Sequence, residues 1–198
     1  MKRRVYLDHL SGGPLAPEVS AAMRPWLEEI HGNAASLHRH GLKAREALDT
    51  AAAQCAAMIG APADDLVFTS SGTEANNLAV KGVAEAQRER GTHLILSNIE
   101  HPSIDQSVAW LEHQGFTATR VPVDREGRLS VGAVAEAITE QTILIATHHA
   151  NHDLGTVQNL PALGALAGER GIPLLIDATA SGGWLPVDVT AHSISLLT

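Results

Sequence analysis

The sequence predicts an α/β fold in which a mostly parallel central sheet carries helices on both faces. Short β-like runs alternate with longer segments whose apolar residues recur at helical spacing, which is the pattern of such a fold. The 198 residues are enough for one domain with a sizeable core. With 44% hydrophobic and 18% charged residues and no low-complexity run, the composition is that of a globular protein.

The predicted elements follow in a regular order. Two helices come first, over residues 17–30 and 42–59, and the second ends at Gly60 with Pro62 beyond it. Strands are predicted at residues 66–69, 94–97, 117–123, 142–147 and 173–177, with helical spacing between several of them, over 75–86, 108–111 and 160–167. A last apolar run, 194–198, has the pattern of another buried strand. We expect an N-terminal arm with helices over 1–60 and a large domain over 61–198 that is incomplete at its C-terminus.

Charge and composition exclude several classes of partner. The net charge of −8 argues against nucleic acid, because that partner needs a clustered basic face and none is visible. No stretch of about 18 apolar residues could span a bilayer. The basic start Met1–Arg4 is followed by Asp8 and His9 before any apolar stretch that a signal peptide requires. The single Cys55 excludes an intrachain disulfide, so we expect a cytoplasmic protein.

The segment Phe68–Asn77 runs from a predicted strand through small hydroxyl residues and one glycine into a helix. Such a turn directs backbone N–H groups and the positive end of the helix dipole at one point, which suits a phosphate. Gly72 lets a ligand approach the main chain, and Thr73 can both cap the helix and donate a hydroxyl. The other interpretation is an ordinary helix N-cap.

Polar side chains also follow the later strands. His101 comes after the run 94–97, at the carboxyl edge where ligands of open α/β sheets collect. Its flat ring could stack on a flat cofactor, or it could be solvated. Asp177 ends an apolar strand, where a carboxylate is costly unless it meets a cation. It is therefore an ion-pair residue, an N-cap or the partner of a pyridinium.

Taken together, these segments resemble the cysteine desulfurase group of class V aminotransferases, which are pyridoxal-phosphate enzymes of fold type I. The resemblance covers nearly the whole chain, from Tyr6 onward. His31–His38 looks like that family's Gly-Asn-Pro-Ser-Ser-Leu-His stretch, and Thr69–Leu78 is close to its phosphate-binding loop. The implied fold is the large domain of fold type I, truncated, after an arm and helices that in the family help to form the dimer and the substrate cleft.

The resemblance implies a role for each candidate residue in holding pyridoxal 5′-phosphate. Gly72 and Thr73 would bind the phosphate, His101 would stack on the pyridine ring, Asn151 would hydrogen-bond the ring hydroxyl, and Asp177 would pair with the ring nitrogen. His101 and Asp177 are the catalytic candidates, since a protonated ring nitrogen makes the cofactor an electron sink for a carbanion formed on an amino-acid substrate. No metal is expected.

The lysine and the cysteine that the family uses are not in place. In the family, a lysine holds the cofactor as a Schiff base and a cysteine on a later loop takes sulfur from the substrate as a persulfide. Lys2 lies in a terminal tail, and Lys43 and Lys81 lie in predicted helices away from the strand ends. The family's lysine, in a Ser-Ala-His-Lys-like segment, would fall a few residues beyond Thr198. Cys55 lies in an Ala-rich helix and is interpreted as a small core residue.

Departures from the family pattern also affect the predicted site. Leu10–Pro14 replaces an Asn-Ala-Thr-Thr-Pro-like entrance, Ala180 stands where a glutamine is expected, and His152–Asp153 stands where the family usually has Asn-Glu. Because Ala180 cannot hydrogen-bond the ring hydroxyl, Asn151 would carry that role alone or share it with water. The choice among cysteine, selenocysteine and other amino acids as substrate cannot be read from this sequence.

Three explanations are compatible with these features: one half of a split enzyme, an expressed fragment, and a pseudoenzyme that serves as a structural or regulatory subunit. The first two are favoured, because the cofactor-facing residues are retained and a sheet stopped mid-strand would expose unpaired backbone. We expect the chain alone to be inactive and a second chain, identical or different, to complete the fold. A rival hypothesis is a metal site built from the histidine-rich segments, although no HExxH-type spacing is present; its ligands would be His101, His148, His149, His152 and Asp153.

Overall fold

The computed structural model describes residues 4–198. These residues form two compact units. The first comprises the chain up to Ala57 together with Pro62–Leu66, and the second comprises Met58–Ala61 and Val67–Thr198. The first unit contains helices and no strand among its described residues, and the second contains the sheet. The division into 1–60 and 61–198 stays a prediction.

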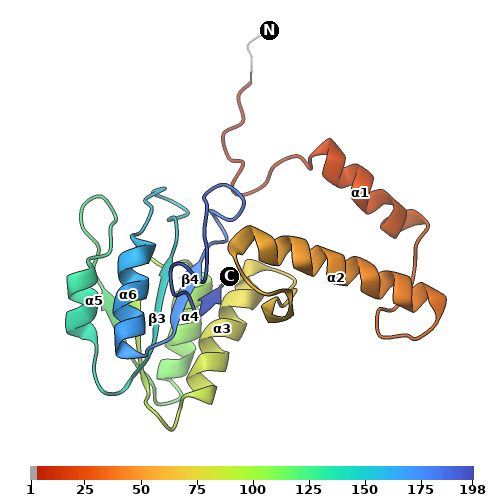
Figure 1. Ribbon diagram of the computed structural model, residues 1–198. Helices are drawn as coiled ribbons and strands as arrows, with labels where there is room; N and C mark the ends of the chain where they lie inside the picture. Colours follow the sequence, from red (N-terminus) through yellow and green to blue (C-terminus); the bar gives the residue numbers. More distant parts are fainter. Residues whose placement is uncertain (1–3) are drawn as a thin grey trace. The chain divides into compact units, whose positions relative to one another are not determined.

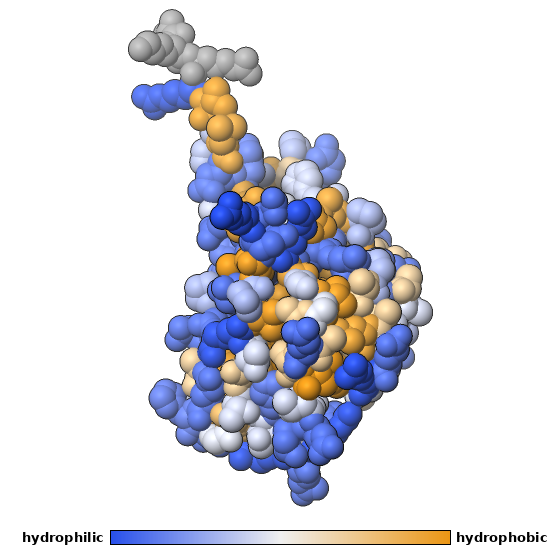
Figure 2. Space-filling view, turned by 90° about the vertical axis from the view of Figure 1, so that its left-hand side faces the viewer, coloured by the Kyte–Doolittle hydropathy of each residue, from blue (hydrophilic) through white to orange (hydrophobic). Residues whose placement is uncertain are grey.

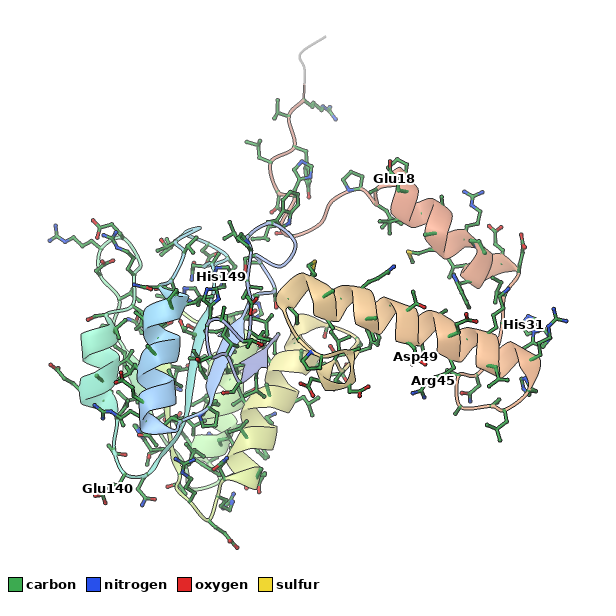
Figure 3. All side chains as sticks on the ribbon, viewed as in Figure 1. Glu18, His31, Arg45, Asp49, Glu140 and His149 are labelled. Carbon is green, nitrogen blue, oxygen red and sulfur yellow. The ribbon has the colours of Figure 1, made fainter. Side chains whose placement is uncertain are left out.

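The first unit is helical. α1 (Pro17–Glu28) begins with a proline, whose fixed φ suits the first helical position and whose missing N–H is not needed there. α2 (Arg39–Ile59) follows, and Arg45 and Asp49, one turn apart on it, form an ion pair of 2.9 Å (Figure 3). Both predicted helices are confirmed, with shifts of a few residues at one end. Among residues 4–198, no helix is both long and apolar enough to cross a membrane.

The second unit is built on a five-stranded sheet. The strands are β1 (His93–Ser97), β2 (Thr117–Val121), β3 (Thr142–His148), β4 (Leu174–Asp177) and β5 (Leu196–Leu197), in the order β2-β1-β3-β4-β5. Every neighbouring pair is parallel. β1, β3 and β4 are buried along their whole length, which explains their nearly continuous apolar sequences. The mostly parallel sheet predicted from the sequence is confirmed.

Helices cover both faces of this sheet (Figure 1). One face carries α3 (Gly72–Ala86) and α4 (Pro102–Glu112), and the other carries α5 (Val131–Ala137) and α6 (Leu160–Arg170). Alternate residues of β1 supply the two cores: Leu94 and Leu96 pack with α3 and α4, whereas Ile95 packs with α5 and α6. The side that carries α5 shows apolar surface bordered by hydrophilic residues (Figure 2). The sequence did not predict α5, because seven residues give little helical periodicity.

The strand predicted at residues 66–69 is wrong. Leu66 has extended backbone angles, but residues 66–69 pair with no strand among residues 4–198. A strand exists through its hydrogen bonds to a neighbour, and the described residues supply none at this point. Val67 and Phe68 are accordingly 69% and 55% exposed, although their apolar character suggested burial.

Candidate active site

The carboxyl ends of the parallel strands place several polar side chains at one edge of the sheet. His101 follows β1, Asn151 follows β3, and Asp177 is the last residue of β4. In Figure 3, His149 marks this end of the sheet, and Glu140, which precedes β3, marks the opposite end. Ligands of open parallel sheets collect outside the carboxyl ends of the strands, so this edge is the candidate active site.

Side chains at the start of α3 and just before it cap the first turn of this helix. Ser71 Oγ accepts a hydrogen bond from the Glu74 N–H (3.2 Å), and Glu74 Oε2 accepts from the hydroxyl and the N–H of Ser70, each at 2.6 Å. These two bonds from Ser70, that of the hydroxyl first, hold the pKa of Glu74 below its ordinary value. No acceptor is found among residues 4–198 for the N–H groups of Gly72 and Thr73, so they can receive an anion.

Gly72 brings the start of α3 against the loop that follows β4. A Cβ atom on Gly72 would lie 2.8 Å from Thr179 Oγ1 and 2.9 Å from Thr179 Cγ2, which is too close for any larger residue without a shift. The N–H of Thr179 donates to Asp177 Oδ1 at 2.9 Å. The glycine therefore allows the phosphate-type loop to touch the segment that carries Asp177.

A chain of hydrogen bonds joins Asp177 to His101. Asn76 Nδ2 donates to Asp177 Oδ2 and to Ser103 Oγ, both at 2.9 Å. Ser103 in turn meets His101 Nδ1 through its hydroxyl (2.7 Å) and its N–H (3.1 Å). Because the Ser103 N–H can only donate, His101 Nδ1 is an acceptor, and the proton of the neutral imidazole is assigned to Nε2. A continuous path of hydrogen bonds thus links the two predicted catalytic residues.

Asn76 and Ser103 are site residues that the sequence reasoning missed. Both are buried polar residues, at 1% and 7% exposure. Asn76 shares the buried face of α3 with Ala79, Val80 and Ala84, so the available signal was an asparagine at a position where the helical spacing favours an apolar residue. A buried amide requires hydrogen-bond partners, and here those partners come from two other elements.

Asp177 retains hydrogen-bonding capacity toward a ligand. It is 6% exposed, and its two oxygens accept one bond each, from the Thr179 N–H and from Asn76 Nδ2. An ionised carboxylate offers about four acceptor sites. None of the ion pairs found among residues 4–198 involves Asp177. Because a buried carboxylate without a cation is costly, a cationic ligand group would stabilise this arrangement.

Asn151 makes its hydrogen bonds within the chain. Its Nδ2 donates to the Ile99 carbonyl (3.1 Å), and its Oδ1 accepts from the N–H groups of Asp153 (3.0 Å) and Leu154 (2.9 Å). The residue is 4% exposed. The amide therefore ties the loop after β3 to the loop after β1, and its predicted contact with the ring hydroxyl stays a prediction.

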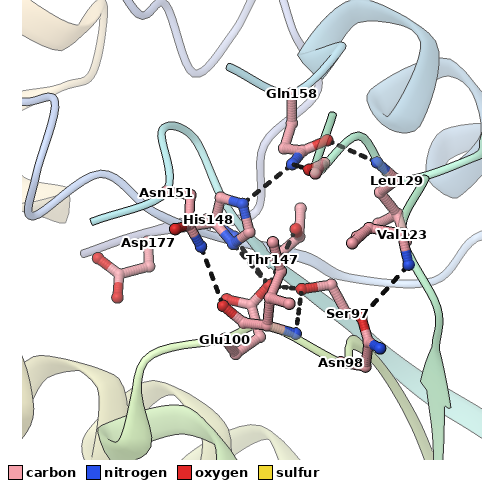
Figure 4. A network of polar contacts seen from close by, with 12 residues as sticks. Ser97, Asn98, Glu100, Val123, Leu129, Thr147, His148, Asn151, Gln158 and Asp177 are labelled. Carbon is pink, nitrogen blue, oxygen red and sulfur yellow. Dashed lines mark hydrogen bonds and ion pairs between the residues drawn. The ribbon is translucent and has the colours of Figure 1, made fainter. Parts of the chain in front are cut away.

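A second polar network lies behind these loops (Figure 4). Glu100 is buried, and its Oε1 accepts hydrogen bonds from the hydroxyls of Ser97 and Thr147 and from the backbone N–H and Nδ1 of His148. Gln158 Nε2 donates to His148 Nε2 at 2.9 Å, while Gln158 Oε1 accepts from the Leu129 N–H at 2.8 Å. Since Leu129 fixes the orientation of the Gln158 amide, His148 is assigned as the neutral tautomer with its proton on Nδ1.

The histidine-rich segment after β3 does not form the metal site of the rival hypothesis. Within residues 4–198, no group of three or more His, Cys, Asp or Glu side chains is placed to hold a metal ion. His148 is engaged with Glu100 and Gln158, and His149 Nδ1 lies 3.0 Å from Ser181 Oγ. Burial, followed by the nearby His192 and His148, lowers the pKa of His149.

The structure therefore brings the start of α3, His101 and Asp177 to one edge of the sheet. The roles of Gly72, Thr73, His101, Asn151 and Asp177 in holding a cofactor stay predictions, and the geometry is compatible with those of the α3 turn, His101 and Asp177. His152, noted in the sequence as a departure from the family pattern and as a ligand of the rival metal site, lies against His101, with ring centroids 5.1 Å apart.

Comparisons with known proteins support the resemblance that the sequence suggested. The sequence matches the family described as Aminotransferase class-V over residues 5–198. The chain belongs to this family. It is 42% identical over 197 residues to the protein named cysteine desulfurase IscS of Dictyoglomus turgidum, and 39% identical over 195 residues to that of Methanosarcina thermophila. These matches cover 100% and 98% of this chain but 50% and 48% of those proteins, so the chain spans about half the length of the curated relatives it matches.

Solved structures of other proteins share the fold. A structure described as SspA in complex with cysteine is 37% identical, with a TM-score of 0.94 over 97% of this chain and 55% of that one. A NifS-like protein is 26% identical, with a TM-score of 0.93 over 97% of this chain and 53% of that one. The fold type I architecture implied by the resemblance is confirmed. Cysteine desulfurases and class V aminotransferases are pyridoxal-phosphate enzymes.

Proposed function

We propose that this chain is the cofactor-binding, N-terminal half of a cysteine desulfurase-like enzyme, which uses pyridoxal 5′-phosphate to release sulfur from L-cysteine. The observation that supports the proposal most is the convergence of the first turn of α3, His101 and Asp177 at one edge of the sheet. The names of the relatives support the same class of reaction.

The residues at this edge fit the chemically distinct parts of the cofactor. The N–H groups of Gly72 and Thr73, with the Thr73 hydroxyl, suit a phosphate at a helix N-terminus. The flat ring of His101 suits the face of a pyridine, and the carboxylate of Asp177 suits a protonated ring nitrogen. When bound, the cofactor would supply an electron sink for a carbanion at the substrate α-carbon.

The chain's own residues would orient and protonate this group. Asp177 would hold a proton on the ring nitrogen, because a buried carboxylate favours a cation beside it. Asn76 and Thr179 bond one oxygen of Asp177 each and thus fix the plane of the carboxylate. Ser103 occupies Nδ1 of His101, which leaves Nε2 as the ring atom that can exchange a proton with a ligand.

The Schiff-base lysine and the sulfur-accepting cysteine would come from outside these residues. Lys81 is directed at Asn77 Oδ1 (2.6 Å) and lies 4.8 Å from the centre of the Trp110 ring, and Lys2 lies outside the described residues. Lys43 and Cys55 belong to the other unit. Within the second unit, β5 pairs only with β4 among the described residues, and Val67 and Phe68 are exposed. A further strand, from a partner chain or from additional sequence, would pair with β5.

A spectral titration tests the proposal. Pyridoxal 5′-phosphate is added to the chain alone and then with a second polypeptide that carries the remaining half of a relative. We expect the cofactor to bind the chain alone and to show the absorbance of a lysine-bound form, with sulfide release from L-cysteine, only in the mixture. A lysine-bound band from this chain alone would show that one of its own lysines reaches the site, and an absence of binding in both states would contradict the proposal.

A second candidate function is that of a structural or regulatory subunit without catalysis. The observation in its favour is Ala180, which removes a polar contact with the ring hydroxyl that the family provides through glutamine. Under this alternative, the chain would bind and stabilise a complete relative without adding sulfide release. Comparing the activity of that relative with and without the chain separates the two proposals.

A further inference from the structure

The buried network of Figure 4 includes Glu100, the residue that directly precedes His101 in the chain. We propose that His148 is a positioning residue for His101: it holds the side chain of Glu100 in place, and Glu100 fixes the connection that carries the His101 ring. The inference rests on the proposed function, because it concerns the ring that would lie against the cofactor.

The connection between β1 and α4 is short and is tied to the neighbouring strands residue by residue. Asn98 donates its N–H to the carbonyl of the last residue of β2 at 3.0 Å. The carbonyl of Ile99 accepts from Asn151 Nδ2, in the loop after β3, at 3.1 Å. Glu100 reaches the end of β3 with a side chain that is 0% exposed. Of these three ties, that of Glu100 is the one adjacent to His101.

His148 supplies two of the four hydrogen bonds that hold Glu100. Its backbone N–H and its Nδ1 donate to Glu100 Oε1 at 3.3 Å and 2.9 Å, and the other two donors are the hydroxyls of Ser97 and Thr147. Glu100 Oε2 has no partner within the described part of the chain, so every hydrogen bond to this carboxylate is made at Oε1. Without the Nδ1 donor the carboxylate is held less firmly, and other positions of its side chain compete.

Gln158 keeps the proton of His148 on the nitrogen that faces Glu100. The amide of Gln158 is fixed at both ends, because its Oε1 accepts from the Leu129 N–H at 2.8 Å and its Nε2 donates to the Gly127 carbonyl at 2.9 Å. The same Nε2 donates to His148 Nε2 at 2.9 Å, so the neutral imidazole carries its proton on Nδ1. His148 is therefore a donor of fixed direction, which is the kind of support that a precisely placed site residue needs.

The position of the His101 ring depends on this support as well as on Ser103. The two bonds from Ser103 to His101 Nδ1 set the orientation of the ring, whereas the connection before it sets the position of its backbone. Stacking on a flat ligand requires both to be correct. His93, at the opposite end of the sheet, is also buried and bonded to two threonines, but it has no such connection to the site, which makes it the matched control.

Two ligands and a double-mutant cycle test the proposal in the chain as it exists, together with any partner that co-purifies. Pyridoxamine 5′-phosphate needs no lysine to bind, and inorganic phosphate tests the α3 turn without a ring. We expect His148→Leu to weaken binding of the first ligand about fivefold and to leave that of the second unchanged. In a His101→Ala background, His148→Leu should cause no further loss. His148→Asn, whose amide can still donate to Glu100, should regain most of the affinity, and His93→Leu should lower stability without changing either affinity.

Nitrogen NMR of the histidine rings gives a measurement that needs no ligand. We expect His101 to show a single tautomer, with its proton on Nε2, in the wild type and in His93→Leu, and a mixture of tautomers in His148→Leu. Thr147→Val removes another donor to Glu100 with almost no change of shape, so it should act in the same direction and serves if His148→Leu does not fold.

The outcomes separate this inference from the proposed function. Unchanged affinity for pyridoxamine 5′-phosphate in His148→Leu, or a loss of the same size with and without the His101 ring, would overturn the inference and leave the proposed function standing. If pyridoxamine 5′-phosphate does not bind the wild-type protein, the proposed function fails, and the tautomer of His101 still decides whether His148 positions its ring.

Discussion

The two ends of the sheet differ in how far their buried polar groups are hydrogen-bonded. At the amino end, both ring nitrogens of His93 lie 2.8 Å from threonine hydroxyls, Nδ1 from Thr142 and Nε2 from Thr119. At the carboxyl end, Glu100 Oε2 has no hydrogen-bond partner among residues 4–198, and Asp177 keeps acceptor sites. A polar group that is satisfied inside the chain contributes to stability, whereas Asp177, at the candidate site, can still accept a hydrogen bond from a ligand.

The largest effect on stability is expected at Glu100. Glu100→Ala removes the acceptor of four donors, from Ser97, Thr147 and His148, and leaves them buried without a partner. We expect a loss of about 3–5 kcal/mol in the free energy of unfolding, measured by urea denaturation. Glu140→Ala, on an exposed residue at the opposite end, is the matched control and should change stability by less than about 0.5 kcal/mol. Equal effects of the two variants would mean that the buried network around Glu100 contributes no more to stability than an exposed carboxylate does.

The next effect concerns ligand affinity at Asp177. Asp177→Asn removes the charge that the proposed cofactor nitrogen would meet, so the affinity for pyridoxamine 5′-phosphate should fall by ~2 kcal/mol or more, which is about 30-fold. Asp153→Asn makes the same change of charge on an exposed side chain nearby and should have a far smaller effect. Isothermal titration calorimetry measures both. Similar losses in the two variants would mean that net charge, and not the position of the carboxylate, determines binding.

Two glycines of α3 sharpen the comparison further, because the helix has one end at the candidate site and the other away from it. Gly72→Ala places a Cβ against Thr179, and we expect a loss of about 1–3 kcal/mol from overpacking. Gly82→Ala meets nothing within 4 Å and should stabilise the helix by up to ~1 kcal/mol. Thermal unfolding of the two variants shows whether each substitution raises or lowers the stability. If Gly72→Ala is neutral or stabilising, the loop after β4 can move away from the added Cβ at little cost in free energy.

The parts that the sequence predicted well are those set by local pattern. Strands β1, β3 and β4 have nearly continuous apolar sequences, and the carboxyl ends of parallel strands meet at one edge of the sheet. His101 and Asp177 could therefore be placed together from their positions after two such runs. The start of α3 was also predictable, because the sequence of small hydroxyl residues and glycine before a helical pattern is itself a local signal.

The parts that the sequence did not predict depend on partners far along the chain. The run at 66–69 has strand composition, but a strand also requires a neighbour, and composition does not report one. The bond from Asn76 to Asp177 joins residues 101 positions apart, and no spacing rule connects an amide on a helix to a carboxylate at the end of a strand. Likewise, the internal bonds of Asn151 became visible only from the path of two loops.

The smallest expected effect is a dependence of stability on pH that both ends share. Burial lowers the pKa of His93 at one end and, as the largest cause, that of His149 at the other. In the unfolded chain these imidazoles take up a proton near an ordinary pKa of about 6.5, whereas in the folded protein they stay neutral to lower pH. The unfolded state then binds more protons, so stability is complete above about pH 6.5 and declines as the pH falls toward the folded pKa.

Urea denaturation at pH 7.5 and pH 5.5 measures this decline. His93→Gln removes one of the two groups, so it should lose less stability on acidification than the wild type, even though it is less stable at pH 7.5 because one threonine bond is lost. His113→Gln, on an exposed histidine, should follow the wild type. The comparison is between the changes with pH and not between the absolute stabilities. If the decline is the same in His93→Gln as in the wild type, His93 contributes nothing to the acid sensitivity. The sensitivity would then arise at the carboxyl end.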